Sequence, residues 1–150
     1  MNSRFTSWSR WPDRGLLDDL SFPGVYALAI SENDITGDPF SWLPAIVYVG
    51  MTNSKGGLKS RLSQFDNTIK GKSGHGGAHR VRFKHSDYPK LTASLYVSVC
   101  AFPCDVTSED PADLRIMGEV AKHEYECLAS FRERFGVLPE FNDKKRSPKK

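Results

Sequence analysis

The sequence predicts one α/β domain with a sheet of about three strands flanked by helices. Short apolar stretches typical of strands occur at residues 24–30, 45–51 and 94–102, and the second and third are each followed by apolar residues at helical spacing. The order strand, strand, helix, strand, helix indicates the α/β class. The chain has 150 residues, 39% of them hydrophobic, which is enough for one core and too short for two domains.

The first two strands share an apolar pattern that contains one tyrosine and one glycine. The stretch "GVYALAI" at 24–30 is apolar on both faces, as in a strand covered on both sides. Residues 31–44 are rich in Asn, Asp, Gly and Pro and predict a long loop, which leads into "AIVYVGM" at 45–51. Residues 1–21 are expected to form an N-terminal extension.

The first helix is predicted by apolar residues at intervals of four, three and four, namely Leu58, Leu62, Phe65 and Ile69. Arg61 lies at the edge of this apolar stripe. Residues 70–85 follow, with four glycines, three histidines and five Lys or Arg. This composition predicts a mobile basic loop that ends in a short edge strand at 79–83.

The last helix has signals at both ends. Asp110 is placed as N-cap, Pro111 at the first helical position and Asp113 for a capping box. Gly136 is placed as C-cap. Because a glycine weakens a helix, Gly118 makes two helical pieces an alternative to one continuous helix over 111–135.

Positive charge is concentrated in two segments. Residues 51–90 carry nine Lys or Arg against two Asp, and residues 144–150 carry five Lys or Arg in seven positions. The tail, 144–150, is expected to be disordered. Both clusters favour a polyanionic partner.

Membrane and secretory classes are disfavoured. The chain has no run of eighteen apolar residues and no apolar segment near its start of the kind that a secretory signal needs. We therefore expect no membrane partner and a cytoplasmic location, nucleoid-associated if the protein is bacterial. Three cysteines in a chain of this size indicate reduced thiols. A structural zinc site is a second interpretation beside ordinary burial for Cys100, Cys104, His123 and Cys127.

Two strand tyrosines, a helix-edge arginine and an acid-rich late helix together suit phosphoryl transfer. Arginine supplies a forked, permanently charged donor for the negative charge of a phosphodiester transition state. A carboxylate can hold Mg²⁺, which offsets the same charge. A tyrosine hydroxyl beside a cation can have its pKa lowered enough to orient or deprotonate an attacking water. Taken singly, such a tyrosine is usually a packing residue and such an arginine a solvated charge.

Five short signatures in order resemble those of the GIY-YIG nuclease family: "GVY" at 24–26, "YVG" at 48–50, "LKSRLSQF" at 58–65, a Glu in a late helix and "LPEFN" at 138–142. The resemblance covers residues 22–143. It implies a three-stranded antiparallel sheet flanked by helices, and hydrolysis of DNA phosphodiester bonds that depends on Mg²⁺ or Mn²⁺. It also implies catalytic roles for Tyr26, Tyr48, Arg61, the late Glu and Asn142.

The late Glu is Glu124 or Glu126. Around the metal-binding Glu of the family, apolar residues tend to stand one turn away on each side, and the neighbours of Glu124 are more apolar than those of Glu126. This favours Glu124 as the metal ligand. Asn142 is equally well explained as a turn residue after the helix.

Three departures from the family pattern bear on activity. Residues 31–44 resemble an insertion, because the two tyrosines are further apart than is usual in the family. Phe65 stands where many members carry a Tyr or His that assists catalysis, for which His75 or His79 could substitute. Met51 stands where many relatives have Lys, and Lys55 is the nearest replacement.

The expected function is a Mg²⁺-dependent DNA endonuclease in which a water activated by Tyr26 or Tyr48 attacks phosphorus. DNA phosphates would be contacted without sequence readout by Lys55, Lys59, Lys70, Lys72, His75, His79, Arg80, Arg82 and Lys84. Specificity would come from residues 31–44, the basic loop, a homodimer or a partner protein. The alternative is a non-catalytic nucleic-acid-binding module of the same fold, which Phe65 and Met51 favour.

Overall fold

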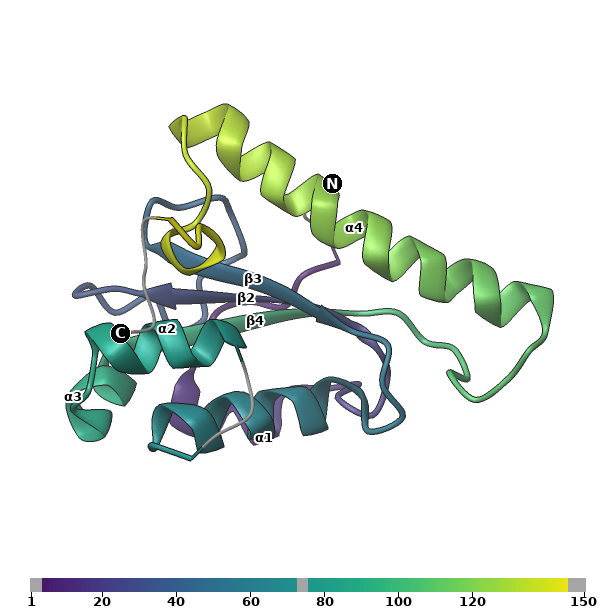
Figure 1. The fold of residues 1–150 in the computed structure, drawn as a ribbon, viewed down its shortest axis with the longest axis horizontal. Helices are drawn as coiled ribbons and strands as arrows, with labels where there is room; N and C mark the ends of the chain where they lie inside the picture. Colours follow the sequence, from purple (N-terminus) through teal and green to yellow (C-terminus); the bar gives the residue numbers. More distant parts are fainter. Residues whose placement is uncertain (1–3, 73–75, 146–150) are drawn as a thin grey trace.

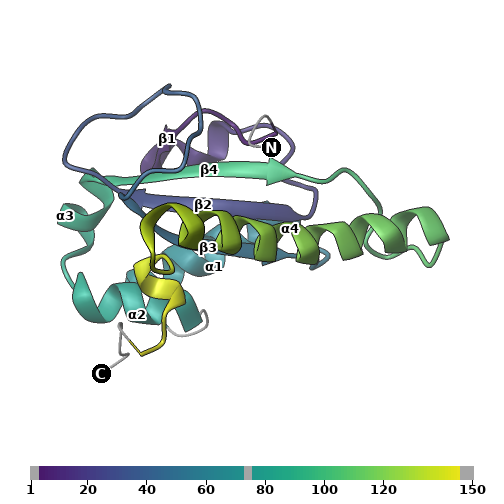
Figure 2. The same cartoon turned by 90° about the horizontal axis from the view of Figure 1, so that it is seen from above.

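The structure, a computed structural model, describes residues 4–72 and 76–145, so His75 and the last five residues of the basic tail lie outside the described residues. A four-stranded antiparallel sheet has the order β1-β4-β2-β3 (Figures 1 and 2). The strands are β1 (Ser9–Arg10), β2 (Gly24–Ile30), β3 (Ile46–Thr52) and β4 (Leu95–Ala101). The antiparallel α/β arrangement is confirmed. The expectation of three strands was wrong, because the two residues of β1 pair with Val97 and Tyr96 of β4.

Helices cover both faces of this sheet (Figures 1 and 2). Helix α1, Gly57–Ile69, packs on one face and helix α4, Pro111–Phe135, on the other. Alternate residues of β2 enter the two cores, Tyr26 and Leu28 under α1, and Val25, Ala27 and Ala29 under α4. This is the strand covered on both sides that the sequence predicts. All four apolar residues of the predicted α1 stripe are buried as well.

The segment expected as an N-terminal extension contributes to both cores. Trp8 packs in the core under α4 and Trp11 in the core under α1. Trp11 opens a short 3-10 helix, η1, Trp11–Leu16. The large apolar side chains of this segment are thus core residues. Strand β1 lies between the two buried tryptophans, which hold it in place beside β4.

Among the described residues of 70–85, the prediction of an edge strand at 79–83 is wrong, because these residues are helical. Helix α2, Gly76–Lys84, occupies most of the segment. Ala78 and Val81, one turn apart, are buried in the core under α1, and Nε of Arg80 donates to the carbonyl of Phe141 at 2.9 Å. These tertiary contacts outweigh the low helix propensity of the glycines. The short helix α3, Tyr88–Ala93, follows; its N-cap Asp87 accepts a hydrogen bond from the backbone N–H of Lys90.

Helix α4 is continuous through Gly118, so it does not break into two pieces. Asp110 is its N-cap but makes no side-chain capping bond. The predicted capping box is therefore absent from this end, and Asp113 instead accepts a hydrogen bond from the backbone N–H of Asp105 at 3.1 Å. Gly136 ends the helix with φ +75°, as predicted. The 3-10 helix η2, Glu140–Asn142, then approaches β3.

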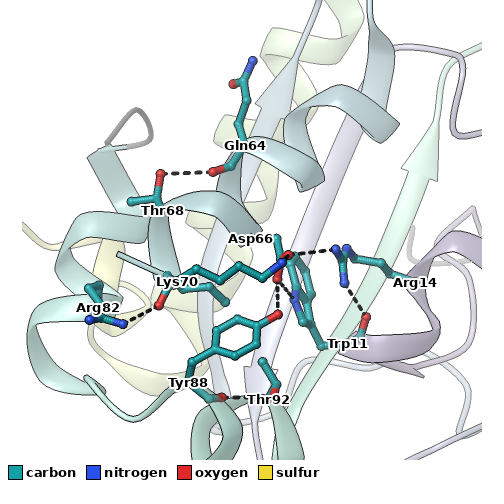
Figure 3. A network of polar contacts seen from close by, with 10 residues as sticks. Trp11, Arg14, Gln64, Asp66, Thr68, Lys70, Arg82, Tyr88 and Thr92 are labelled. Carbon is teal, nitrogen blue, oxygen red and sulfur yellow. Dashed lines mark hydrogen bonds and ion pairs between the residues drawn. The ribbon is translucent and has the colours of Figure 1, made fainter. Parts of the chain in front are cut away.

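A buried carboxylate joins η1, α1 and α3 (Figure 3). Asp66 of α1 accepts hydrogen bonds from Nε1 of Trp11 at 2.8 Å and from the hydroxyl of Tyr88 at 2.7 Å. Its other oxygen pairs with Arg14 at 3.2 Å and with Lys70 at 2.9 Å. Because Asp66 is only 4% exposed, these donors offset the cost of burying its charge. The network fixes α1 against the N-terminal segment.

Within residues 4–72 and 76–145, no helix combines the length and the apolar character that crossing a bilayer requires.

Candidate functional site

The two motif tyrosines lie close together on the face of the sheet that α1 covers. Tyr26 of β2 stands opposite Gly50 of β3, two residues beyond Tyr48 on the same side of the strand. The ring centroids of Tyr26 and Tyr48 are 6.1 Å apart. Tyr26 is fully buried, whereas Tyr48 retains 9% exposure.

Two glycines allow the backbone to approach these phenols. A Cβ atom on Gly50 would lie 2.5 Å from the hydroxyl oxygen of Tyr26, and one on Gly77 of α2 would lie 2.8 Å from that of Tyr48. Both distances are too short for any side chain, so only glycine fits. The Gly50 contact explains the glycine of "YVG". The contact of Gly77 was missed from sequence, although the pair of glycines at 76–77 was the available signal.

Arg61 of α1 joins the tyrosines. Its guanidinium hydrogen-bonds to Tyr26, and its Nη1 donates to Oε1 of Gln64 at 3.1 Å. Its Nε is buried and has no hydrogen-bond partner among the described residues. A buried N–H without an acceptor costs about 1–3 kcal/mol. Arg61 therefore places one buried donor without an acceptor among the described residues beside the phenol of Tyr26.

Glu124 of α4 supplies negative charge to the same site. Burial raises the pKa of Glu124, and the nearby charge of Arg61 lowers it by less. In turn, the negative charge of Glu124 raises the pKa of Tyr26 and the pKa of Tyr48. Glu126 lies on the exposed side of the helix. Of the two late glutamates, Glu124 is thus the one that the fold brings to the tyrosines and Arg61.

The protonation state of the phenols limits what they can do. Burial raises the pKa of Tyr26 well above its usual 10.0, the neighbouring Tyr48 raises it further, and Arg61 opposes this. The pKa of Tyr48 is also raised by burial, against the charge of Arg61. The sequence predicts that a neighbouring cation lowers the pKa of a tyrosine, but the charge of Arg61 alone does not bring the pKa of either tyrosine below its usual value. Both tyrosines are neutral at pH 7 and can donate a hydrogen bond that orients water.

Asn142 and Phe65 support Tyr48 from two sides. The Asn142 amide donates to the carbonyl of Val49 and accepts from the Val49 N–H, both at 2.9 Å. These bonds hold the outer edge of β3 beside Tyr48, so Asn142 is a positioning residue. Phe65 is fully buried, with its ring 6.0 Å from that of Tyr48. It packs against the phenol and offers no proton.

A second positioning contact was not predicted from sequence. Nδ2 of Asn53, the residue after β3, donates to the carbonyl of Met117 on α4 at 3.0 Å. This bond ties the strand that carries Tyr48 to the helix that carries Glu124. The "TN" after "YVGM" was the only sequence signal, and it reads equally well as an ordinary turn.

The side chains near the site determine which metal ion could bind there. Over the described ranges, no group of three or more His, Cys, Asp or Glu is placed to hold a metal ion, and this includes the cysteine and histidine set considered for zinc. Mg²⁺ retains several waters and uses one or two carboxylates together with substrate phosphates. Glu124, half-buried beside Arg61, is the carboxylate that would hold Mg²⁺ or Mn²⁺ in that mode.

The lysines expected to contact DNA divide into two groups. Lys55, Lys59 and Lys72 are exposed. Lys70 is paired with Asp66, and Lys84 is paired with Glu140 at 2.6 Å. The first group is therefore better placed to contact a polyanion.

The other basic candidates belong to α2 and its approach. Arg80 is 7% exposed and bonded to the carbonyl of Phe141, and Nη1 of Arg82 donates to the carbonyl of Ile69 at 2.9 Å. His79 is half-buried, and His75 lies outside the described residues. The two arginines thus hold α2 over Tyr48.

No family model, curated protein or solved structure matches this chain.

Proposed function

We propose that the chain is a metal-dependent DNA endonuclease of the GIY-YIG type. One observation carries the proposal. Four side chains from four elements, Tyr26, Tyr48, Arg61 and Glu124, lie within mutual electrostatic range. The sequence signatures select the same residues without reference to the fold. An arginine and a metal-binding carboxylate can stabilise the negative charge that develops in phosphodiester hydrolysis, and a phenol can orient the attacking water.

Arg61 is assigned to the scissile phosphate. The forked guanidinium of an arginine suits two oxygens of one phosphate. A guanidinium is a charged, forked donor, so it would stabilise the additional negative charge of the transition state. The hydrogen bond to Tyr26 keeps the guanidinium oriented before substrate arrives.

Tyr48 is assigned to the attacking water. It is the more exposed of the two phenols, and its neutral hydroxyl orients a water by hydrogen bonding. Tyr26, fully buried, acts by holding Arg61. Glu124 is assigned to the divalent cation, which when bound supplies positive charge beside the phosphate and the leaving oxygen.

One set of observations favours the alternative, a nucleic-acid-binding module without turnover. Tyr26 has no exposed surface, both phenols have raised pKa values, and Phe65 replaces a residue that could transfer a proton. Such a module would keep the phosphate contact of Arg61 and the exposed lysines. It would bind DNA through the backbone and leave it intact.

Nicking of supercoiled plasmid in the presence of Mg²⁺ separates the two functions. The proposal expects wild-type nicking, and loss of nicking in Arg61→Ala and Glu124→Gln. Arg134→Ala, at an exposed arginine of α4, is the matched control and should nick normally. If the wild type retards plasmid on a gel but never nicks it, the binding module is correct. Equal nicking by the wild type and both site variants would place the activity elsewhere.

A further inference from the structure

Helix α4 carries an apolar face that the rest of the described chain does not cover. The N-terminal half of α4 extends past the end of the sheet (Figures 1 and 2). Leu114 is 52% exposed and Tyr125 73% exposed. Together with Gly118 and Ala121 they form the α4 stripe, whose intervals of four, three and four match the apolar seam of a coiled coil.

Gly118 is unexplained by the fold around it. A Cβ atom there would have no atom of another described element within 4 Å. Glycine weakens a helix interior relative to alanine, and neither φ nor a neighbouring segment requires it here. Close packing of a second helix against α4 would explain why position 118 carries a glycine.

The α4 stripe is complementary to itself when reversed. In an antiparallel pair centred between residues 119 and 120, Leu114 of one copy faces Tyr125 of the other, and Gly118 faces Ala121. The large residues then lie at the two ends and the small ones at the crossing point. A two-fold axis produces this self-matching contact, in which one surface serves both copies.

The charges beside the stripe favour the same orientation. Arg115, Glu119, Lys122 and Glu126 are all exposed and alternate in sign along one flank. Reversal brings Arg115 near Glu126 of the second copy and Glu119 near Lys122 of the second copy. In a parallel two-fold pair the two charged flanks would lie on opposite sides of the pair, and these pairs of opposite charge would not form. Charge therefore selects an antiparallel second copy of this chain as the occupant.

We propose that the α4 stripe is a homodimer interface in which two copies of α4 pack antiparallel. The two Glu124 residues would then lie on the same flank of the pair, about 14 Å apart along its axis at about 1.5 Å per residue. Two nuclease sites would face one duplex. That consequence rests on the proposed function, whereas the dimer itself does not.

Sedimentation equilibrium of the full chain over micromolar to near-millimolar concentrations tests the interface. The wild type should reach twice the 16.8 kDa of one chain. Leu114→Glu and Tyr125→Glu should each weaken the dimer by at least about tenfold, because a carboxylate is buried in the seam. Leu16→Glu, at a leucine 83% exposed outside α4, should dimerise as the wild type does. Far-UV circular dichroism checks that each variant is folded.

A charge-swap series keeps the result specific. Glu119→Lys and Lys122→Glu should each weaken the dimer, and the double variant should restore it, since the pairs are re-formed with signs exchanged. A wild type that remains monomeric throughout, stripe variants that dimerise normally, or a double variant no better than the singles would overturn the proposal. Plasmid nicking is a separate readout, so the interface and the nuclease can fail independently.

Discussion

Replacing Asp66 by Asn removes one charge from the network that joins η1, α1 and α3. The substitution keeps the size of the side chain and leaves an oxygen that can still accept from Trp11. It removes the attraction to Arg14 and Lys70. The fold should survive with lower stability, because the core of α1 is apolar and remains intact.

The magnitude follows from the exposure of each partner. The Lys70 side chain is 46% exposed and that of Arg14 23%, so the two pairs together are worth about 1–1.5 kcal/mol after solvent screening. Weaker hydrogen bonds from Trp11 and Tyr88 to a neutral acceptor cost about 1 kcal/mol more. We expect the free energy of unfolding to fall by about 2–2.5 kcal/mol. For a chain of this length the Tm should fall by roughly 8 °C.

The loss should depend on pH in a defined direction. Burial raises the pKa of Asp66, but the hydrogen bonds from Trp11, Lys70 and Tyr88 and the charge of Arg14 outweigh it, so the net pKa lies below the ordinary value of 3.8. A carboxyl with a depressed folded-state pKa stabilises the fold above its unfolded-state pKa and loses that contribution as pH falls through the folded-state pKa. The wild type and Asp66→Asn should therefore differ most at neutral pH and converge in acid.

Urea unfolding followed by tryptophan fluorescence at neutral and acidic pH measures both effects. Asp18→Asn, at an exposed aspartate, is the matched control and should change stability by no more than about 0.5 kcal/mol. If Asp66→Asn matches the wild type at pH 7, or if the difference between them grows on acidification, the network does not stabilise the fold as described.

Three further predictions concern residues around the site and the network. Gly50→Ala should destabilise by about 1–3 kcal/mol because its Cβ would meet a phenol at 2.5 Å, whereas Gly15→Ala, with open space around it, should be near neutral; equal urea midpoints would contradict this. Asn142→Ala should cost about 1–3 kcal/mol by leaving the N–H and carbonyl of Val49 without their partner, and normal stability would show that water replaces the amide. Tyr88 should ionise at about 12 in an ultraviolet titration, because burial and the hydrogen bond to Asp66 raise its pKa; in Asp66→Asn this pKa should move toward 10, and no movement would refute the assignment.

The parts of the fold that sequence predicted are those set by apolar periodicity. The strand at 24–30 and the helix carrying Leu58 and Leu62 were recognisable, because each side chain enters a core at the spacing of its element. Helix α2 was missed because Arg80 and Val81 stabilise it through tertiary contacts, which local composition does not contain. Strand β1 is two residues long and has no period to detect.

The residues of the candidate site likewise divide into those that the sequence predicted and one contact that it could not predict. Tyr26, Tyr48 and Arg61 were selected by their spacing in the motifs, and the fold brings them together. The choice of Glu124 followed from its apolar neighbours on one face of α4. The contact of Gly77 with Tyr48 required the position of α2, so sequence could not supply it.

The most direct test of the nuclease is cleavage of an end-labelled DNA duplex with Mg²⁺, comparing Glu124→Gln with Glu126→Gln. The two glutamates share one helix, but only Glu124 is half-buried in electrostatic range of Arg61. We predict that Glu126→Gln cleaves at close to the wild-type rate and that Glu124→Gln is at least about a hundredfold slower. Comparable cleavage by both variants, or loss of cleavage in Glu126→Gln alone, would contradict the assigned site.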